Sequence, residues 1–182
     1  MVLMCLYVFT FPKYKTEEIT GAFFGVCYVP VMLSFLYQTR EMQDGVYLVW
    51  LIFLSSWGCD TCAYCSGMLL GKHKLAPVLS PKKSIEGAIG GTLGSAILGL
   101  IYAWIFGSRM HGIEEPVIAC TAACAIAAVI SQIGDLAASA IKRNHKVKDY
   151  GHIIPGHGGI LDRFDSMIFT APAIYFVLTF LG

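Results

Sequence analysis

The stretch GVYLVWLIFLSSWGCDTCAYCSGMLLG, residues 45–71, runs for 27 residues with a single charged side chain, Asp60. A helix that crosses a bilayer needs about 20 predominantly apolar residues, because each residue advances it by about 1.5 Å. The stretch therefore predicts a transmembrane helix with a carboxylate inside it. Such a charge costs about 2.5–3.5 kcal/mol on insertion scales, so Asp60 is a candidate functional residue. The alternative is a structural ion pair with a lysine.

The rest of the chain repeats this pattern and predicts an all-α, polytopic membrane protein. Four further stretches of 17 to 26 residues carry at most one charge: Gly21–Tyr37, Gly87–Gly107, Pro116–Ile141 and Ser166–Gly182. Together with residues 45–71 they make five spans, and the apolar Met1–Phe11 is too short to be a sixth, so we expect the remnant of a longer helix there. Charged residues are only 14% of the chain, against about 25% in soluble domains.

The basic residues predict how the five spans are threaded. Eleven of the thirteen lysines and arginines fall on one side of the membrane, and only Arg40 and Arg109 fall on the other. Connections rich in lysine and arginine stay in the cytoplasm. The three basic loops, Pro12–Thr20, Lys72–Glu86 and Lys142–Asp165, are therefore predicted to be cytoplasmic.

Small side chains in the apolar stretches are interpreted as packing residues. Most of the seven cysteines lie in apolar runs, where a free thiol behaves as a small apolar group. Cys59, Cys62 and Cys65 repeat every third residue, but a closed zinc site needs a fourth ligand, and only His73 is near. Within Gly87–Gly107, glycines four residues apart share one face and predict close contact with neighbouring helices.

The second intramembrane carboxylate, Asp135, begins a polar stripe. Ser139 follows four residues later and Lys142 three residues after that, so the three side chains share one helix face. A carboxylate, a hydroxyl and an ammonium in line suit a metal-bound polyphosphate. Asp60 and Asp135 lie roughly 10–18 Å inside the nearest basic loop residues. We therefore expect a polar cavity that opens to the cytoplasm.

The segment KDYGHIIPGHGGILDRFD, residues 148–165, concentrates polar chemistry. Glycines flank His157 and allow backbone N–H groups to approach an anion closely, so His157 is a candidate phosphate donor. Asp162 and Asp165 are three residues apart, and one helical turn would place both on one side. Mg²⁺ commonly uses one or two carboxylates together with substrate phosphates. Asp162 alone also fits a helix cap.

The segment SPKKSIEG, residues 80–87, holds a second basic group. Ser84 is a predicted cap for the helix that follows. Lys82 and Lys83 would then lie just outside a helix N-terminus, which already favours phosphate. The alternative is that the two lysines only anchor the loop on the cytoplasmic side.

Residues 139–165, SAIKRNHKVKDYGHIIPGHGGILDRFD, resemble the signature of the CDP-diacylglycerol synthases, also called phosphatidate cytidylyltransferases. The shared pattern is Ser-x-x-Lys-Arg, then Lys-Asp, then Pro-x-His-Gly-Gly, then Asp-Arg-x-Asp. Residues 59–91 and 132–143 are similar to the same family, so the resemblance covers residues 57–182. Family members are usually longer. We therefore expect residues 1–182 to form one integral-membrane catalytic domain that corresponds to the C-terminal part of a longer family member.

The resemblance implies transfer of CMP from CTP to phosphatidic acid, which gives CDP-diacylglycerol and pyrophosphate. It also implies Mg²⁺, with a second cation such as K⁺ as an option, and a homodimer in the bacterial inner membrane whose active site faces the cytoplasm. No nucleic acid partner is expected. The implied metal ligands are Asp135, Asp162, Asp165 and Asp60. The implied catalytic residues are Asp135, Asp162, Lys142, His157 and Asp165. The implied substrate-binding residues are Lys82, Lys83, Ser84, Ser139, Arg143, Lys148 and Arg163.

Two other functions remain open from the sequence. One is a different membrane enzyme that uses CTP, such as a polyprenol kinase or an archaeal-type lipid cytidylyltransferase. The other is an ion-coupled transporter, which would also explain Asp60, Asp135 and the glycine-rich helix. Transporters usually show internal repeats, and none is visible in this sequence.

Overall fold

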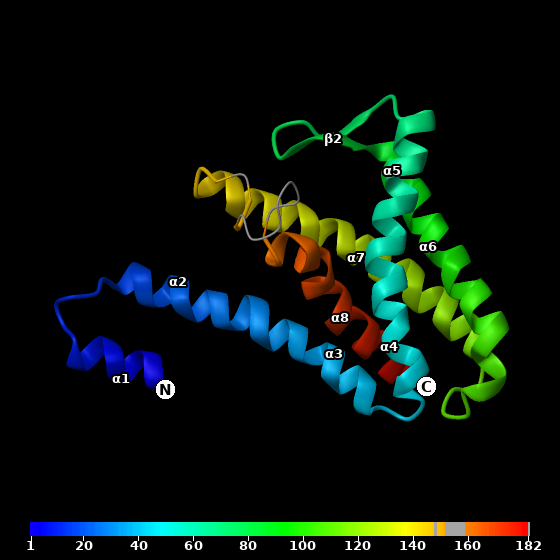
Figure 1. The fold of residues 1–182 in the computed structure, drawn as a ribbon, viewed down its shortest axis with the longest axis horizontal. Coiled ribbons are helices and arrows are strands. Elements are labelled where there is room, and N and C mark those ends of the chain that lie inside the picture. Colours follow the sequence, from blue (N-terminus) through cyan, green and yellow to red (C-terminus); the bar gives the residue numbers. More distant parts are fainter. Residues whose placement is uncertain (148, 152–158, 182) are drawn as a thin grey trace.

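The computed structural model describes residues 1–147, 149–151 and 159–181 as a bundle of long helices (Figure 1). A short helix, α1 (Val2–Phe9), precedes them and buries none of its side chains. Five helical segments within the described residues are long and apolar enough to cross a membrane: Thr16–Glu41, Gly45–Leu70, Ile85–Arg109, Pro116–Asn144 and Leu161–Leu181. The chain is therefore a multi-pass membrane protein, and the predicted all-α class with five spans is confirmed.

The first two spans each contain a π-helical turn. The first consists of α2 (Thr16–Val26), η1 (Cys27–Val31) and α3 (Met32–Glu41). Pro30 lies within η1, where its missing N–H removes a helical hydrogen bond and a wider turn relieves the clash of its ring. The second span consists of α4 (Gly45–Phe53), η2 (Leu54–Gly58) and α5 (Cys59–Leu70).

The remaining spans are α6 (Ile85–Phe106), which continues as the 3₁₀ turn η3 (Gly107–Arg109), α7 (Pro116–Asn144) and α8 (Leu161–Leu181). The predicted loop Lys142–Asp165 was wrong at both of its ends. Helix α7 includes Lys142 and Arg143, because cations are favourable in the last turn of a helix. Helix α8 begins before Asp162, because a carboxylate is favourable in the first turn.

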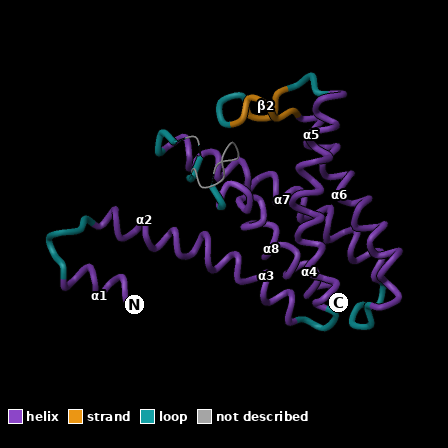
Figure 2. The backbone as a smooth tube through the Cα atoms, in the orientation of Figure 1, coloured by secondary structure: helices purple, strands orange, loops and turns teal. Residues whose placement is uncertain are grey.

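A β-hairpin connects α5 to α6, where the sequence predicted only a loop (Figure 2). Strands β1 (Lys74–Ala76) and β2 (Ser80–Ser84) pair antiparallel, with Lys74 opposite Ser84. Lysine and proline have low strand propensity, so the sequence did not indicate these strands. The Glu86 carboxylate supports the hairpin by accepting hydrogen bonds from the backbone N–H of Lys72 (3.1 Å) and of His73 (3.2 Å).

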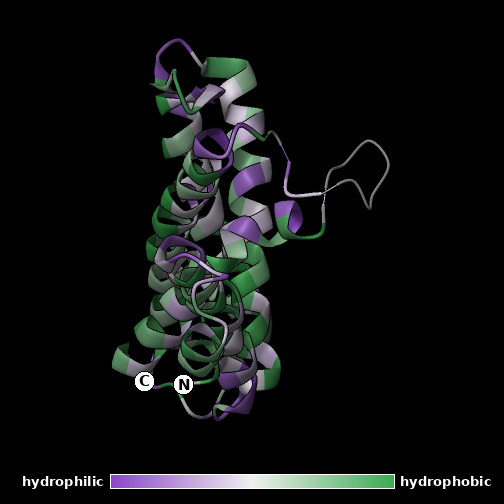
Figure 3. Cartoon of the chain, turned by 90° about the vertical axis from the view of Figure 1, so that its left-hand side faces the viewer, coloured by the Kyte–Doolittle hydropathy of each residue, from purple (hydrophilic) through white to green (hydrophobic). Residues whose placement is uncertain are grey.

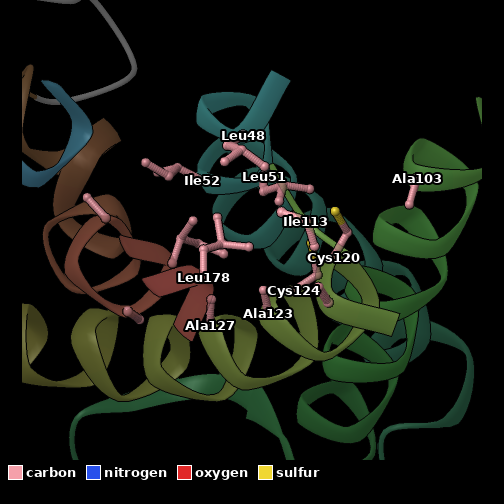
Figure 4. Packing of buried hydrophobic residues seen from close by; sticks show 14 of the residues in the cluster. Leu48, Leu51, Ile52, Ala103, Ile113, Cys120, Ala123, Cys124, Ala127 and Leu178 are labelled. Atoms are coloured by element: carbon pink, nitrogen blue, oxygen red, sulfur yellow. The ribbon is translucent and has the colours of Figure 1, made fainter. Parts of the chain in front are cut away.

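The buried core lies where α4, α7 and α8 meet, and α6 closes it (Figure 4). Leu51 and Ile52 of α4 and Leu178 of α8 are fully buried or nearly so. They pack on a side of α7 built from small residues, among them Cys120 and Cys124. Both cysteines are fully buried free thiols, so the predicted role in packing is confirmed for them, whereas Cys5 and Cys27 are exposed.

The glycines of α6 lie where neighbouring helices approach most closely. A Cβ atom at Gly91 would lie 2.8 Å from the Cβ of Ala63 on α5, and one at Gly99 would lie 2.8 Å from the carbonyl oxygen of Cys120 on α7. Contacts that short require the helices to move apart. The prediction that this helix uses its glycines for packing is confirmed.

The outer surface of the bundle is apolar, as the hydrocarbon of a membrane requires. Figure 3 shows apolar colouring along the helices and polar colouring at turns and at the hairpin. Trp104 of α6 is 81% exposed, although it is large and apolar. At one end of the bundle the turn between α3 and α4 meets the segment after η3, where the backbone N–H of Gly112 donates to Asp44 Oδ2 (2.6 Å).

Candidate active site

Carboxylates from three spans gather in one polar region of the bundle. Asp60 lies on α5, Asp135 on α7 and Asp165 on α8. Asp135 is within range of charge interaction with both Asp60 and Asp165. Ser166 joins α8 to the second span, because its hydroxyl lies 3.4 Å from Asp60 Oδ2 and 2.7 Å from the hydroxyl of Ser56. Residues more than 100 positions apart in the sequence therefore share this region.

Two lysines reach the carboxylates from different elements. Lys83 of β2 forms an ion pair with Asp135 of α7. Lys142, in the last turn of α7, places its Nζ 2.9 Å from Asp162 Oδ1 and 3.5 Å from Asp165 Oδ2 of α8. The two ammonium groups thus link the hairpin to α7 and α7 to α8.

This carboxylate–lysine cluster, which we define as Asp60, Lys83, Asp135, Lys142, Asp162 and Asp165, has an excess of acidic groups. It contains four carboxylates and two ammonium groups, a formal difference of −2. Such an excess in a partly buried region favours additional cations, because charges interact strongly where water is scarce.

A cavity of about 350 Å³ opens beside the cluster, between α5, the hairpin, α6 and α7. Its polar lining includes Asp60, Lys82, Lys83, Ser84, Gln132 and Asp135. Its apolar lining includes Tyr64 and Met68 of α5, which are each 67% exposed on the outer surface of the bundle. The cavity therefore extends from the charged cluster to the lipid-facing surface.

Ser84 holds the start of α6 beside this cavity. Its hydroxyl accepts a hydrogen bond from the backbone N–H of Gly87 (3.1 Å), so the predicted helix cap is confirmed. Lys82 and Lys83 directly precede this N-terminus in β2. The cap thereby fixes the strand that carries both lysines.

Asp162 ties the connection between α7 and α8 to both helices. Its Oδ2 accepts hydrogen bonds from the backbone N–H groups of Tyr150 (2.8 Å) and Gly159 (3.0 Å), while its Oδ1 faces Lys142. The carboxylate thus has a partner on each oxygen. Asp162 lies within the first turn of α8 and its backbone donors precede the helix, so it does not form the N-cap considered for it from the sequence.

Tyr150 is a residue of this region that the sequence analysis missed. Its hydroxyl donates to the carbonyl oxygen of Ala138 (3.2 Å), and the Nζ of Lys142 lies 5.1 Å from its ring centroid. Burial raises the pKa of the Tyr150 phenol above its ordinary value. The ring therefore covers Lys142 on one side and stays a neutral hydrogen-bond donor.

Gln132 is a second residue that the sequence analysis missed. Its side-chain amide donates to the carbonyl oxygen of Ala88 (3.1 Å) and to the hydroxyl of Thr92 (3.0 Å), both on α6. It lies three residues before Asp135 and lines the same cavity. Its position one turn from an intramembrane aspartate was the available signal.

The other predicted residues divide into three groups. Ser139 is half-buried on α7 between Asp135 and Lys142. Arg143 and Arg163 are exposed, at the end of α7 and the start of α8. Lys148 and His157 lie outside the described residues.

The donor set fits Mg²⁺ held together with substrate phosphates. Within residues 1–147, 149–151 and 159–181, no three His, Cys, Asp or Glu side chains are close enough to hold a metal ion by themselves. Mg²⁺, however, commonly takes only one or two carboxylates and completes its octahedral coordination with water and phosphate oxygens. Asp60, Asp135 and Asp165 offer such oxygens, and the acidic excess of the cluster favours a cation.

Fold and site together define a polytopic membrane protein with a charged, cavity-bearing site among its helices. Residues 1–181 match the model of the Cytidylyltransferase family, and the chain belongs to this family. The match includes residues 1–56, which the signature resemblance did not cover.

Curated relatives agree with this assignment. The chain is 37% identical over 177 residues to a phosphatidate cytidylyltransferase of Staphylococcus haemolyticus, a match that covers 97% of the chain and 65% of the relative. It is 42% identical over 154 residues to a protein of the same name from Staphylococcus aureus strain COL, which covers 85% of the chain and 56% of the relative. The chain therefore spans about 56–65% of the length of these relatives. The predicted family is confirmed.

Proposed function

We propose that this protein is a phosphatidate cytidylyltransferase that makes CDP-diacylglycerol and pyrophosphate from CTP and phosphatidic acid. The observation that supports it best is the carboxylate–lysine cluster beside a cavity that is lined by both charged and apolar side chains. Both substrates carry phosphates, and one of them is a lipid. Membership of the Cytidylyltransferase family and the names of the relatives support the same reaction.

In the proposed reaction, a phosphate oxygen of phosphatidic acid attacks the α-phosphorus of CTP. A new P–O bond forms, the bond from the α-phosphorus to the oxygen that bridges to the β-phosphorus breaks, and pyrophosphate leaves. No covalent enzyme intermediate is needed. The protein contributes position and charge, as in other phosphoryl transfers. Lys83 and Lys142 supply ammonium groups next to the carboxylates, where they would neutralise phosphate oxygens.

Mg²⁺, when bound, would neutralise phosphate charge and polarise the phosphoryl oxygens. We assign its protein ligands to one or two of the carboxylates of Asp60, Asp135 and Asp165, with K⁺ as an optional second cation. Asp162 remains a predicted ligand, but its contacts to Lys142 and to two backbone N–H groups favour a role in positioning Lys142. The exposed Arg143 and Arg163 remain proposed phosphate-binding residues, as do Lys148 and His157, which lie outside the described residues.

The cavity suits a phosphate-bearing lipid. Lys82, Lys83 and Ser84 belong to its polar lining, and Tyr64 and Met68, which are also exposed on the outer surface, belong to its apolar lining. A phosphatidic acid molecule in the bilayer would place its phosphate at the lysines and its acyl chains along the apolar lining. The strong bias of basic residues supports a cytoplasmic orientation for this site, where CTP is available. We further expect a homodimer in the bacterial plasma membrane.

The test is an assay of membranes that contain the protein, with Mg²⁺, phosphatidic acid and CTP labelled at the α-phosphorus. The proposal expects label in CDP-diacylglycerol and release of unlabelled pyrophosphate. A lipid kinase would instead transfer the unlabelled γ-phosphate to the lipid and leave the label in CDP. Ion movement into liposomes without any CDP-lipid would indicate a transporter, and either result would contradict the proposal.

A further inference from the structure

Tyr28 lies in the first span, outside the region that resembles the family signature, and its hydroxyl is buried without a hydrogen-bond partner among the described residues. A buried hydroxyl without a partner is unfavourable, and native proteins rarely leave one unexplained. The residue belongs to the π-helical turn η1, and such turns often occur at functional sites. Both features suggest that the hydroxyl meets a ligand.

Aromatic contacts fix the Tyr28 ring at the level of the carboxylate–lysine cluster. The ring stacks on Phe24 with 5.3 Å between centroids and meets Phe169 of α8 edge-on at 5.9 Å. Phe169 is one helical turn from Asp165. It also packs against Gly134, where a Cβ atom would lie 2.7 Å from the Phe169 ring. The ring of Tyr28 therefore contacts α8 through Phe169, and Phe169 in turn packs against α7 at Gly134, the residue before Asp135.

The Tyr28 hydroxyl is within range of charge interaction with Asp135, Asp165 and Tyr150. These groups already have other partners. Asp135 pairs with Lys83, and Asp165 accepts from the backbone N–H of Ser166 (2.9 Å) and faces Lys142. The Tyr150 hydroxyl donates to a backbone carbonyl. The Tyr28 hydroxyl makes no hydrogen bond to any of these groups, so its donor is available to a molecule that enters the cluster.

We infer that the Tyr28 hydroxyl donates a hydrogen bond to a phosphate oxygen of a bound substrate. This inference rests on the proposed cytidylyltransferase function. A neutral phenol adds a donor without adding charge, which suits an anionic oxygen that already lies close to lysines. The first span would then contribute directly to substrate binding, in addition to covering α8.

The test is Tyr28→Phe, which removes the hydroxyl and keeps the ring packed between Phe24 and Phe169. Tyr37→Phe is the matched control, because it makes the same change in the same span at a position that is 66% exposed. Loss of a hydrogen bond to a charged group weakens binding by about 10- to 100-fold. For Tyr28→Phe we expect the KM for CTP, for phosphatidic acid, or for both to rise by this factor. For Tyr37→Phe we expect no change in either KM. The affected KM identifies which phosphate the hydroxyl contacts.

Direct binding separates this inference from the proposed function. Binding of CTP, and of vesicles that contain phosphatidic acid, is measured with both variants. A loss of about tenfold or more in either affinity supports the contact, even if the wild-type protein makes no CDP-diacylglycerol. Affinities and KM values of Tyr28→Phe equal to those of Tyr37→Phe would overturn the inference and leave the proposed function intact. Without substrate, the unfolding temperature of Tyr28→Phe should be no lower than that of the wild-type protein, because the hydroxyl has no hydrogen-bond partner among the described residues.

Discussion

Lys142 Nζ, near the end of α7, lies 2.9 Å from Asp162 Oδ1, near the start of α8, and only 13% and 5% of the two side chains are exposed. The pair joins two helices whose connecting segment carries much of the family signature. Because Asp162 also accepts from the backbone N–H groups of Tyr150 and Gly159, one carboxylate fixes both the lysine and the ends of the connection that the structure describes. Stability and activity should therefore depend together on this pair.

Lys142→Met should lower both the stability of the protein and its activity. The substitution leaves Asp162 and Asp165 without their cation, and removal of one partner from a buried ion pair costs about 3–5 kcal/mol. We expect a lower temperature of unfolding in detergent and at least a 100-fold loss of CDP-diacylglycerol synthesis. Lys72→Met is the control, because the Lys72 side chain is exposed at the end of α5. Equal behaviour of the two variants would contradict the role assigned to Lys142.

Asp135→Asn should abolish turnover while membrane insertion is preserved. The amide keeps the shape of the side chain but loses the charge that pairs with Lys83 and would bind a cation. Insertion is measured by the level of protein in washed membranes and turnover by the labelled CTP assay. Glu114→Gln, an equivalent change at an exposed position before α7, should leave both unchanged. Near-normal turnover of Asp135→Asn would refute the assignment of Asp135 as a metal ligand.

Removal of divalent cations should stop the reaction reversibly. The carboxylate–lysine cluster has two more carboxylates than ammonium groups, so it requires further positive charge before it can accept two phosphate-bearing substrates. We expect EDTA to eliminate product formation and Mg²⁺ to restore it. Full activity in EDTA, measured on washed membranes, would exclude the proposed Mg²⁺ requirement.

Gly91→Ala should destabilise the bundle. The added Cβ atom would lie 2.8 Å from Ala63 and 2.9 Å from the carbonyl oxygen of Cys59, so α5 and α6 would have to separate. Overpacking of this kind costs about 1–3 kcal/mol. Gly25→Ala is the matched control, since a Cβ atom there meets nothing within 4 Å. The unfolding temperature in detergent should fall for Gly91→Ala and should not fall for Gly25→Ala.

The sequence predicted the spans well because membrane helices are defined mainly by length and apolar character, which are local properties. Its errors occurred at the helix ends near the site. Lys142 and Asp162 are charged, so the apolar pattern assigned them to a loop, yet they neutralise each other and both are helical. This pairing joins residues 20 positions apart, and hydropathy does not contain that information.

The sequence identified many residues of the candidate site, but it did not show which of them contact one another. Asp60 and Asp135 were identified because charges are rare inside spans, and the structure puts both on one cavity. Their partners could not be assigned from spacing. Lys83 reaches Asp135 from a hairpin that the sequence did not predict, because its residues have low strand propensity. Tyr28 reaches the region from a part of the first span that has no charged residue nearby in the sequence.

The hairpin has a consequence for how the protein moves during a reaction cycle. Lys83 belongs to a short strand and not to a membrane helix, so its ammonium group can leave Asp135 without displacement of any span. Exchange of one positive partner for another on Asp135 is then a local rearrangement at the surface of the bundle. The closely packed helices α5 and α6 would need no movement for this exchange.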